Sequence, residues 1–249
     1  MDIKDKPAEL QYQTYMNEII YITDAKILAI PTIESNEPLI DIKNDNKLKY
    51  GPPPECELTA KCYTIIRKTV YEKLCQAQIN LSKGWRFRLY EGFRSLEVQQ
   101  MLFAQEYKRV VNRYPNKTEE FHFYETTRLV SPVTNFDGSQ NIPPHNTGAA
   151  VDIEIITEEG QLVDMGMTAK DWCNVNPEIC LTDCKLISKA AQQNRKLLLE
   201  IMQEQEFVNY PTEWWHFSYG DRYWAYHQPV KRAMYGSADA LFKSLEKGE

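Results

Sequence analysis

Two long stretches of the chain place their hydrophobic residues at the three- and four-residue spacing of a helix. Between residues 58 and 79 these positions are Leu58, Cys62, Ile65, Ile66, Val70, Leu74 and Ala77. Between residues 184 and 205 they are Ile187, Ala190, Ala191, Leu197, Leu198, Ile201 and Met202. Because such spacing puts side chains on one helical face, each stretch is predicted to be an amphipathic helix with one buried side.

Three shorter helices are also predicted, the first of them from its capping residue. Ser95 can cap a helix from Leu96 to about Val111, because a serine side chain accepts a hydrogen bond from a free N–H of the first turn. Residues 119–128 are expected to form a short helix, and residues 237–247 a final one.

Strands are predicted where hydrophobic and polar residues alternate. Residues 85–90 alternate in this way, and so do residues 149–157. In the second run the apolar face is Val151, Ile153 and Ile155, which leaves Asp152 and Glu154 on the opposite face. The further β-prone runs are residues 207–219, which are rich in aromatic side chains, and residues 19–22 and 26–30.

The order of these elements indicates the fold class. Helices and strands interleave without the repeated strand–helix–strand rhythm of a parallel sheet, so we predict an α+β fold in which helices flank a central, mostly antiparallel sheet. The 249 residues are enough to enclose one sizeable core, and no repeat or low-complexity segment divides them. Residues 1–249 are therefore predicted to form a single domain.

Composition and charge narrow the classes of partner. The formal net charge is −6 and Lys and Arg are not clustered, so nucleic acid is not an expected partner, because phosphate binding needs concentrated positive charge. No apolar stretch is long enough to cross a bilayer, and the first twenty residues lack the apolar core of a secretory signal. We expect a cytoplasmic protein that does not bind membranes; the alternative is a periplasmic or exported protein whose signal was removed.

The cysteines leave the redox state partly open. They are Cys56, Cys62, Cys75, Cys173, Cys180 and Cys184. Cys62 and Cys75 lie in a helical pattern, where free cysteine serves as a small apolar residue, so reduced thiols are favoured there. The group at residues 173–184 could include a disulfide, but its spacing is not typical of a second zinc site.

The residues that carry chemistry lie in two short stretches. One runs from His145 to Asp152 and the other is Glu213-Trp-Trp-His216. Catalytic zinc takes three protein ligands from His, Asp, Glu or Cys and leaves one position for water. His145, Asp152 and His216 fit that count, and Glu213 could take a proton from the water. The two stretches together predict a hydrolytic zinc site.

Strand geometry sets a condition on this site. Residues three apart point to opposite faces of a strand, so Glu213 and His216 can converge only at a strand end, a bulge or a strong twist. The other two histidines, His122 and His227, have no comparable neighbours and are not expected to bind metal.

Taken together, these motifs resemble those of the zinc D-alanyl-D-alanine dipeptidases, the family that includes the vancomycin-resistance dipeptidase. The resemblance rests on His145-x-x-Gly-x-Ala-x-Asp152 and on the Glu213-Trp-Trp-His216 segment. It extends to Glu91-Gly-Phe-Arg94, to Gly160-Gln-Leu-Val-Asp-Met-Gly166 and to the predicted helix before the second motif, and it covers about residues 58–219.

The resemblance implies a fold like that of the hedgehog and D-Ala-D-Ala metallopeptidases, with one Zn²⁺ per chain held by His145, Asp152 and His216. It also implies that Glu213 acts as general base and acid and that Arg94 holds the carbonyl oxygen of the scissile bond. A fixed guanidinium at a developing oxyanion is most effective in a dry, low-dielectric site.

Two positions depart from the family pattern. The family usually has serine two residues before the first histidine ligand, where this chain has Pro143, which offers no hydrogen-bond donor. After Gly166, the segment that bears the family's ammonium-binding aspartate is one residue longer here, and Asp171 is the candidate for that role.

The favoured prediction is a zinc-dependent D-alanyl-D-alanine dipeptidase, in which hydroxide at the zinc attacks the amide carbonyl of D-Ala-D-Ala or a related D-containing dipeptide. Its partner is thus a small peptide substrate, while the sequence does not indicate an oligomeric state. Two alternatives stay open: a zinc D,D-carboxypeptidase or endopeptidase acting on peptidoglycan stem peptides, and a non-catalytic zinc-stabilised binding module. The intact Glu213 and Arg94 weigh against the second.

Overall fold

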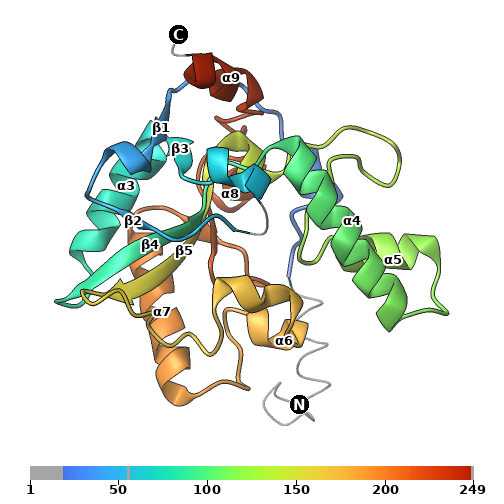
Figure 1. The fold of residues 1–249 in the computed structure, drawn as a ribbon. Helices are drawn as coiled ribbons and strands as arrows, with labels where there is room; N and C mark the ends of the chain where they lie inside the picture. Colours follow the sequence, from blue (N-terminus) through green and yellow to red (C-terminus); the bar gives the residue numbers. More distant parts are fainter. Residues whose placement is uncertain (1–18, 55–56, 248–249) are drawn as a thin grey trace.

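The fold is built on a mixed sheet, shown in Figure 1, in a computed structural model that describes residues 19–54 and 57–247. Within these residues the larger sheet has five strands, in the order β2 (Lys49–Tyr50), β4 (Trp85–Glu91), β5 (Ala150–Thr157), β7 (His216–Ser218) and β6 (Val208–Asn209). Only the β2–β4 pair is parallel among these strands. A smaller sheet pairs β1 (Leu39–Asp41) with β3 (Ile65–Arg67). The predicted α+β fold with a mostly antiparallel sheet is confirmed.

Helices cover the sheet and extend beyond it. The longer ones are α3 (Lys68–Ile79), α4 (Leu96–Arg113), α5 (Glu119–Thr126), α7 (Lys189–Glu204) and α9 (Asp239–Lys247). The short ones are α2 (Ala25–Leu28), α6 (Pro177–Cys180) and α8 (Arg222–His227), with 3₁₀ turns η2 (Ile42–Asn44), η3 (Glu57–Lys61), η4 (Pro144–Thr147) and η5 (Ala169–Cys173). Figure 1 shows α3 and α7 close together beside the sheet, while α4 and α5 pair on the other side of the molecule.

The main hydrophobic core lies between the sheet and the helices α3 and α7. Phe87 of β4 and Ile155 of β5 are fully buried and belong to the same cluster as Leu74 of α3 and Leu198 of α7. Full burial of one such side chain is worth about 1.5–3 kcal/mol, so β4 and β5 are firmly anchored on this face. Their other face is available for polar side chains.

Several predicted elements are present with small changes at their ends. Ser95 caps α4 as expected, with its hydroxyl accepting from Val98 N at 3.3 Å. The predicted strands at 85–90 and 149–157 correspond to β4 and β5, and the predicted helices at 119–128 and 237–247 contain α5 and α9.

The single helix predicted over residues 58–79 is wrong in its first half. Residues 57–61 form η3, residues 65–67 form β3, and the helix α3 begins only at Lys68. Ile65 and Ile66 are β-branched, which favours strands, and they pair with Asp41 and Ile40 of β1. Strand pairing therefore prevails over the helical spacing of this stretch.

The other predictions that fail concern where an element begins or turns. Residues 19–22 and 26–30 form no strand; α2 begins after Asp24, whose carboxylate caps it by accepting from Lys26 N at 2.8 Å. The helix predicted from residue 184 begins at Lys189, because Ser188 caps it. The strand predicted over residues 207–219 is two short strands, β6 and β7, separated by a turn that contains Pro211.

The cysteines of the described chain are free thiols. They are Cys62, Cys75, Cys173, Cys180 and Cys184, while Cys56 lies outside the described residues. The prediction of reduced thiols at Cys62 and Cys75 is confirmed. The disulfide that the sequence left open for residues 173–184 is not formed.

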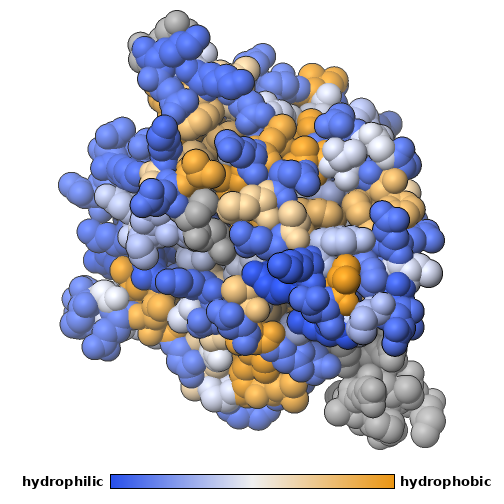
Figure 2. Space-filling model, turned by 45° about the vertical axis from the view of Figure 1, so that its right-hand side comes forward, coloured by the Kyte–Doolittle hydropathy of each residue, from blue (hydrophilic) through white to orange (hydrophobic). Residues whose placement is uncertain are grey.

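Neither the helices nor the drawn surface of the described residues has the features of a membrane-spanning segment. None of the helices there is both long enough and apolar enough to cross a bilayer. On the face drawn in Figure 2, hydrophobic residues lie in small groups separated by hydrophilic ones. Scattered apolar side chains of this kind are normal on a folded protein surface.

Arg67, at the end of β3, ties three distant segments together. Its side chain is fully buried, and its guanidinium forms an ion pair with Glu34 at 3.0 Å. It also donates to the backbone carbonyl oxygens of Glu37 and Thr147, each at 2.8 Å. Since Thr147 belongs to η4, Arg67 connects the N-terminal segment to the loop that precedes β5.

Replacing Arg67 with Met should lower the free energy of unfolding by about 3–5 kcal/mol, because it leaves a carboxylate and two carbonyl groups without their buried cation. The matched control is Arg86→Met, since Arg86 is 46% exposed and lies 3.9 Å from Glu158. That change should cost less than about 1 kcal/mol. Urea unfolding of both variants provides the comparison, and equal losses would contradict the role given to Arg67.

Candidate metal centre

Two of the predicted metal ligands are direct neighbours across a pair of strands. In the antiparallel pairing of β5 with β7, Asp152 lies opposite His216. Residues paired in this way have their Cβ atoms about 4.5–5.5 Å apart on the same face of the sheet. The register of the sheet therefore brings a carboxylate and an imidazole together from positions 64 residues apart.

The third predicted ligand, His145, reaches the same place from the turn η4. Pro144 begins this turn and Gly148 ends it with a left-handed φ of 68°. Residues with a side chain rarely adopt this φ, and a Cβ atom at Gly148 would lie 2.9 Å from the Leu39 side chain, so glycine is favoured at this turn into β5. Arg94 N donates to the carbonyl oxygen of His145 at 3.2 Å, which joins the turn to the end of β4.

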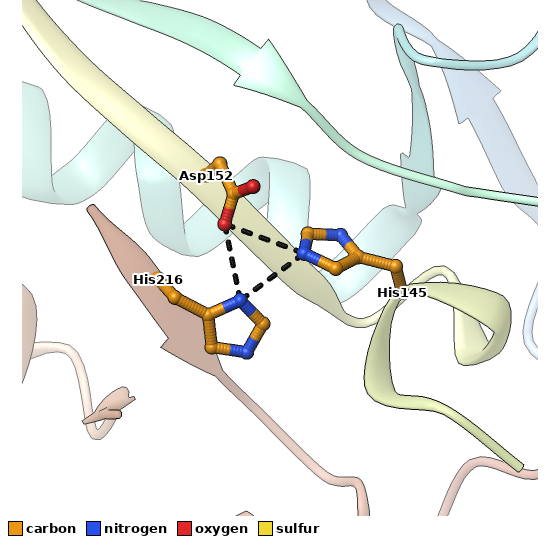
Figure 3. Close-up of side chains that lie close together, drawn as sticks. All are labelled: His145, Asp152 and His216. Atoms are coloured by element: carbon orange, nitrogen blue, oxygen red, sulfur yellow. Dashed lines mark hydrogen bonds and ion pairs between the residues drawn. The ribbon is translucent and has the colours of Figure 1, made fainter. Parts of the chain in front are cut away.

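Figure 3 shows the three side chains pointing toward one another. His145 Nε2 lies 3.1 Å from His216 Nδ1 and 3.3 Å from Asp152 Oδ1, and His216 Nδ1 lies 3.0 Å from the same oxygen. All three residues are buried. Ligands at zinc distances in a tetrahedral site stand about 3.3 Å apart, so this donor set fits one metal ion.

The ring nitrogen of His145 that faces away from the other two residues, Nδ1, also supports metal binding at this group. His145 Nδ1 lies 2.8 Å from the carbonyl oxygen of Gly92, which can only accept a hydrogen bond. Nδ1 therefore carries the proton, and the lone pair of Nε2 points toward Asp152 and His216. A metal-binding histidine is typically oriented by such a contact.

Charge within the group favours a bound cation. Burial by itself would raise the pKa of Asp152, but His145 and His216 offset it and hold the pKa of this carboxyl well below its usual range. Asp152 is thus ionised, and two imidazole nitrogens converge on one of its oxygens. Of the described residues, these three form the group with metal-binding potential, and His122 and His227 lie outside it.

Glu213 lies in the turn between β6 and β7, three residues before His216. This position meets the condition set by the sequence, since His216 begins β7 and Glu213 lies outside the strand. Glu213 is 8% exposed and lines the same pocket as the three converging residues. Burial, followed by the negative charge of Asp152, raises the pKa of Glu213 well above its usual value. A raised pKa suits a carboxyl group that must both accept and return a proton.

Arg94 enters the pocket with its guanidinium held by two neighbours. Its Nε donates to Glu91 Oε1 at 3.0 Å, a second nitrogen contacts the other oxygen of Glu91, and Nη1 donates to Gln99 Oε1 at 3.1 Å. Nη2 lies 4.0 Å from Asp152 Oδ2. The guanidinium is therefore fixed beside the three converging donors.

Glu91 and Gln99 also belong to the site, although neither was predicted from the sequence. Glu91 is 1% exposed and Gln99 is 2% exposed, although both are polar. The signal for Glu91 was its place in the Glu91-Gly-Phe-Arg94 motif, three residues from the arginine it holds. Gln99 gave no comparable signal, because a polar residue in the first turns of a helix is ordinarily exposed.

The pocket itself has a volume of about 50 Å³ and a mixed lining. Besides the residues already described, apolar and aromatic side chains line it, among them Ile22, Leu102, Leu129, Trp172, Tyr210 and Trp215. Asp171 is not among the lining residues. Its carboxylate instead accepts from the hydroxyl and the backbone N–H of Thr168, at 2.7 and 3.2 Å, at the start of η5.

The chain is similar to known peptidases over most of its length. The sequence model of the family described as D-ala-D-ala dipeptidase, peptidase M15, matches residues 56–234. Proteins named D-alanyl-D-alanine dipeptidase are similar to it as well. The one from Synechocystis sp. is 29% identical over 242 residues, covering 85% of this chain and 96% of that protein.

Two further relatives carry the same name. The protein from Enterococcus faecalis is 27% identical, covering 60% of this chain and 70% of that protein. The protein from Escherichia coli is 36% identical over a shorter region, covering 29% of this chain and 36% of that protein. A solved structure of the LdcB LD-carboxypeptidase aligns with a TM-score of 0.39 and 13% identity over 87% of this chain and 75% of that chain. That likeness is too weak to support an inference.

Replacing His216 with Ala should abolish tight metal binding, because it removes one of three donors that meet at a single point. After dialysis against zinc and gel filtration, the unchanged protein should carry about one zinc per chain and the variant almost none. His227→Ala is the control, since His227 is exposed and lies at the end of α8. Retention of stoichiometric zinc by His216→Ala would contradict the assigned donor set.

Proposed function

This chain belongs to the D-Ala-D-Ala dipeptidase family of peptidases, peptidase M15, and we propose that it is a zinc-dependent dipeptidase acting on D-Ala-D-Ala or a closely related D-containing dipeptide. The observation that carries the proposal is the convergence of His145, Asp152 and His216 in one pocket with Glu213 and Arg94. A metal-binding group alone would also suit a structural site. A buried carboxyl group and a fixed guanidinium beside it are what peptide hydrolysis requires.

Each residue in the proposal has a task that its surroundings support. Zinc held by the three donors would lower the pKa of a water molecule and polarise the substrate carbonyl. Glu213 would accept the proton of the attacking water and return it to the leaving amine. Its burial supports the first of these steps, because burial raises the pKa of Glu213 and a carboxylate with a raised pKa takes up a proton more readily than an exposed one.

Arg94 would hold the oxygen of the scissile carbonyl as negative charge develops on it. Its side chain is 13% exposed, so water competes little for the guanidinium. Contacts with Glu91 and Gln99 fix its direction before substrate arrives, which lowers the reorganisation needed in the transition state. Lysine could not reproduce this arrangement, since it lacks the planar group that bonds to two neighbours at once.

The choice of a free dipeptide over a longer peptide is supported by the similar proteins. In the structure, Ile22, from the segment that precedes α2, forms part of the pocket wall. The names of the similar proteins from Synechocystis sp. and Enterococcus faecalis agree with this choice.

Replacing Glu213 with Gln should leave about one zinc per chain but lower kcat for D-Ala-D-Ala by roughly 10²–10⁴-fold, because glutamine keeps the shape and cannot take the proton. Glu200→Gln, on the exposed side of α7, is the matched control and should keep its rate. Zinc content and initial rates are measured on the same preparations. A Glu213→Gln enzyme with near-normal turnover would remove Glu213 from this role.

The substrate assignment is tested by comparing kcat/KM for D-Ala-D-Ala, for L-Ala-L-Ala and for a pentapeptide stem that ends in D-Ala-D-Ala. The proposal predicts that the free D,D-dipeptide exceeds the other two by more than about 100-fold. Efficient release of the last residue from the pentapeptide would assign a carboxypeptidase instead. A zinc-loaded, folded protein inert toward all three would point to a non-catalytic binding module.

A further inference from the structure

The ring of His216 has two nitrogens, and only one of them faces the converging donors. Nδ1 lies 3.1 Å from His145 Nε2 and 3.0 Å from Asp152 Oδ1. If Nδ1 binds a metal ion, a neutral imidazole must carry its proton on Nε2. This Nε2 is buried, and no group in residues 19–54 or 57–247 forms a hydrogen bond with it. His145 differs, because the ring nitrogen that faces away from the converging donors, Nδ1, contacts the carbonyl oxygen of Gly92.

Two side-chain oxygen atoms close to His216 in the sequence are also buried without a hydrogen-bond partner among the described residues. Ser218 Oγ and Asp221 Oδ2 are buried, and neither has a hydrogen bond of ordinary geometry within the described chain. His216 and Ser218 are two residues apart in β7, so their side chains leave the same face of the strand. Gly220 then turns the chain with a left-handed φ of 72°, and Asp221 follows it at once.

Asp221 uses only one of its carboxylate oxygens in the fold. Oδ1 accepts from Trp224 N at 2.9 Å and caps α8. Oδ2 is left for another donor, and a buried carboxylate oxygen without one is costly. Burial raises the pKa of Asp221, while the backbone N–H of Trp224, the hydroxyl of Ser218 and the ring of His216 lower it.

The hydrogen-bonding capacities of the three groups complement one another. An imidazole N–H only donates, a hydroxyl both donates and accepts, and a carboxylate oxygen only accepts. His216 Nε2, Ser218 Oγ and Asp221 Oδ2 therefore form a complete set in which every group has a partner. Small movements that join them would give all three buried atoms a hydrogen-bond partner at once. One continuous series of hydrogen bonds is therefore favoured over three buried polar atoms without partners.

We propose that Asp221 is a positioning residue for the metal ligand His216, acting through Ser218. The Ser218 hydroxyl accepts the hydrogen bond from His216 Nε2 and donates its own proton to Asp221 Oδ2. This arrangement fixes the tautomer that presents Nδ1 to the metal and makes Nδ1 a stronger donor, as carboxylate partners do for other metal-binding histidines. The inference rests on the proposed function only in taking His145, Asp152 and His216 as a zinc site.

Two variants of the full-length protein test this inference without removing the cap of α8. Asp221→Asn keeps a capping side chain, since asparagine caps helices about as well as aspartate. Ser218→Ala removes the hydroxyl and leaves Asp221 in place. Asp24→Asn is the matched control, because Asp24 also caps a short helix, α2, but lies outside this group. Each protein is stripped of metal, and its zinc dissociation constant is measured by competition with a fluorescent chelator.

Both test variants should bind zinc about 10–100-fold more weakly than the unchanged protein, whereas Asp24→Asn should bind it equally well. In the zinc-loaded protein, the ¹⁵N resonance of His216 Nε2 should move in both test variants and not in the control. Thermal unfolding of the metal-free proteins shows whether the fold is retained. Zinc affinity within twofold of normal in Asp221→Asn, with an unmoved Nε2 resonance, would overturn the inference even if the variant melted earlier.

These results are separable from the outcome for the proposed function. Zinc affinity and the histidine resonance are measured without substrate, so a protein inert toward D-containing dipeptides could still confirm the role of Asp221. Conversely, an active dipeptidase whose zinc affinity ignored both substitutions would keep the proposed function and lose this inference.

Discussion

In the antiparallel pair of β5 and β7, Asp152 lies directly opposite His216, so two metal-binding side chains leave adjacent strands on one face of the sheet. The opposite face of β5 is sealed against α3 and α7 by buried Val151, Ile153 and Ile155. A shift of one residue in this register would turn Asp152 into the core and the apolar side chains outward. The same packing that stabilises the sheet therefore fixes the positions of two of the three donors.

The residues around the donors are held by neighbours rather than left free. The end of β4 contributes twice, because the Gly92 carbonyl oxygen orients His145 while Glu91 orients Arg94. A Cβ atom at Gly92 would lie 2.6 Å from the carbonyl oxygen of Ile65, so the backbone there approaches β3 closely. Positions fixed in this way suit catalysis, since little reorganisation remains for the reaction itself.

The sequence predicted the donors better than the elements that carry them. The convergence of His145, Asp152 and His216 could be predicted because their joint pattern with Glu213 resembles that of a zinc peptidase family, and Asp152 was correctly placed on the face opposite the apolar residues of β5. The break at Lys68 was missed, since the pairing of Ile65 and Ile66 with β1 depends on a strand 24–26 residues away that local spacing cannot reveal. For the same reason Gln99 gave no sign that it would be buried against Arg94.

We infer that one metal ion lies at the point where His145 Nε2, Asp152 Oδ1 and His216 Nδ1 converge, with one coordination position open. Anomalous diffraction from crystals of the zinc-loaded protein, recorded on both sides of the zinc absorption edge, tests it most directly. We predict a single strong peak within bonding distance of these three atoms and a fourth ligand that is not a protein atom. A peak elsewhere, or a fourth ligand supplied by the chain, would contradict it.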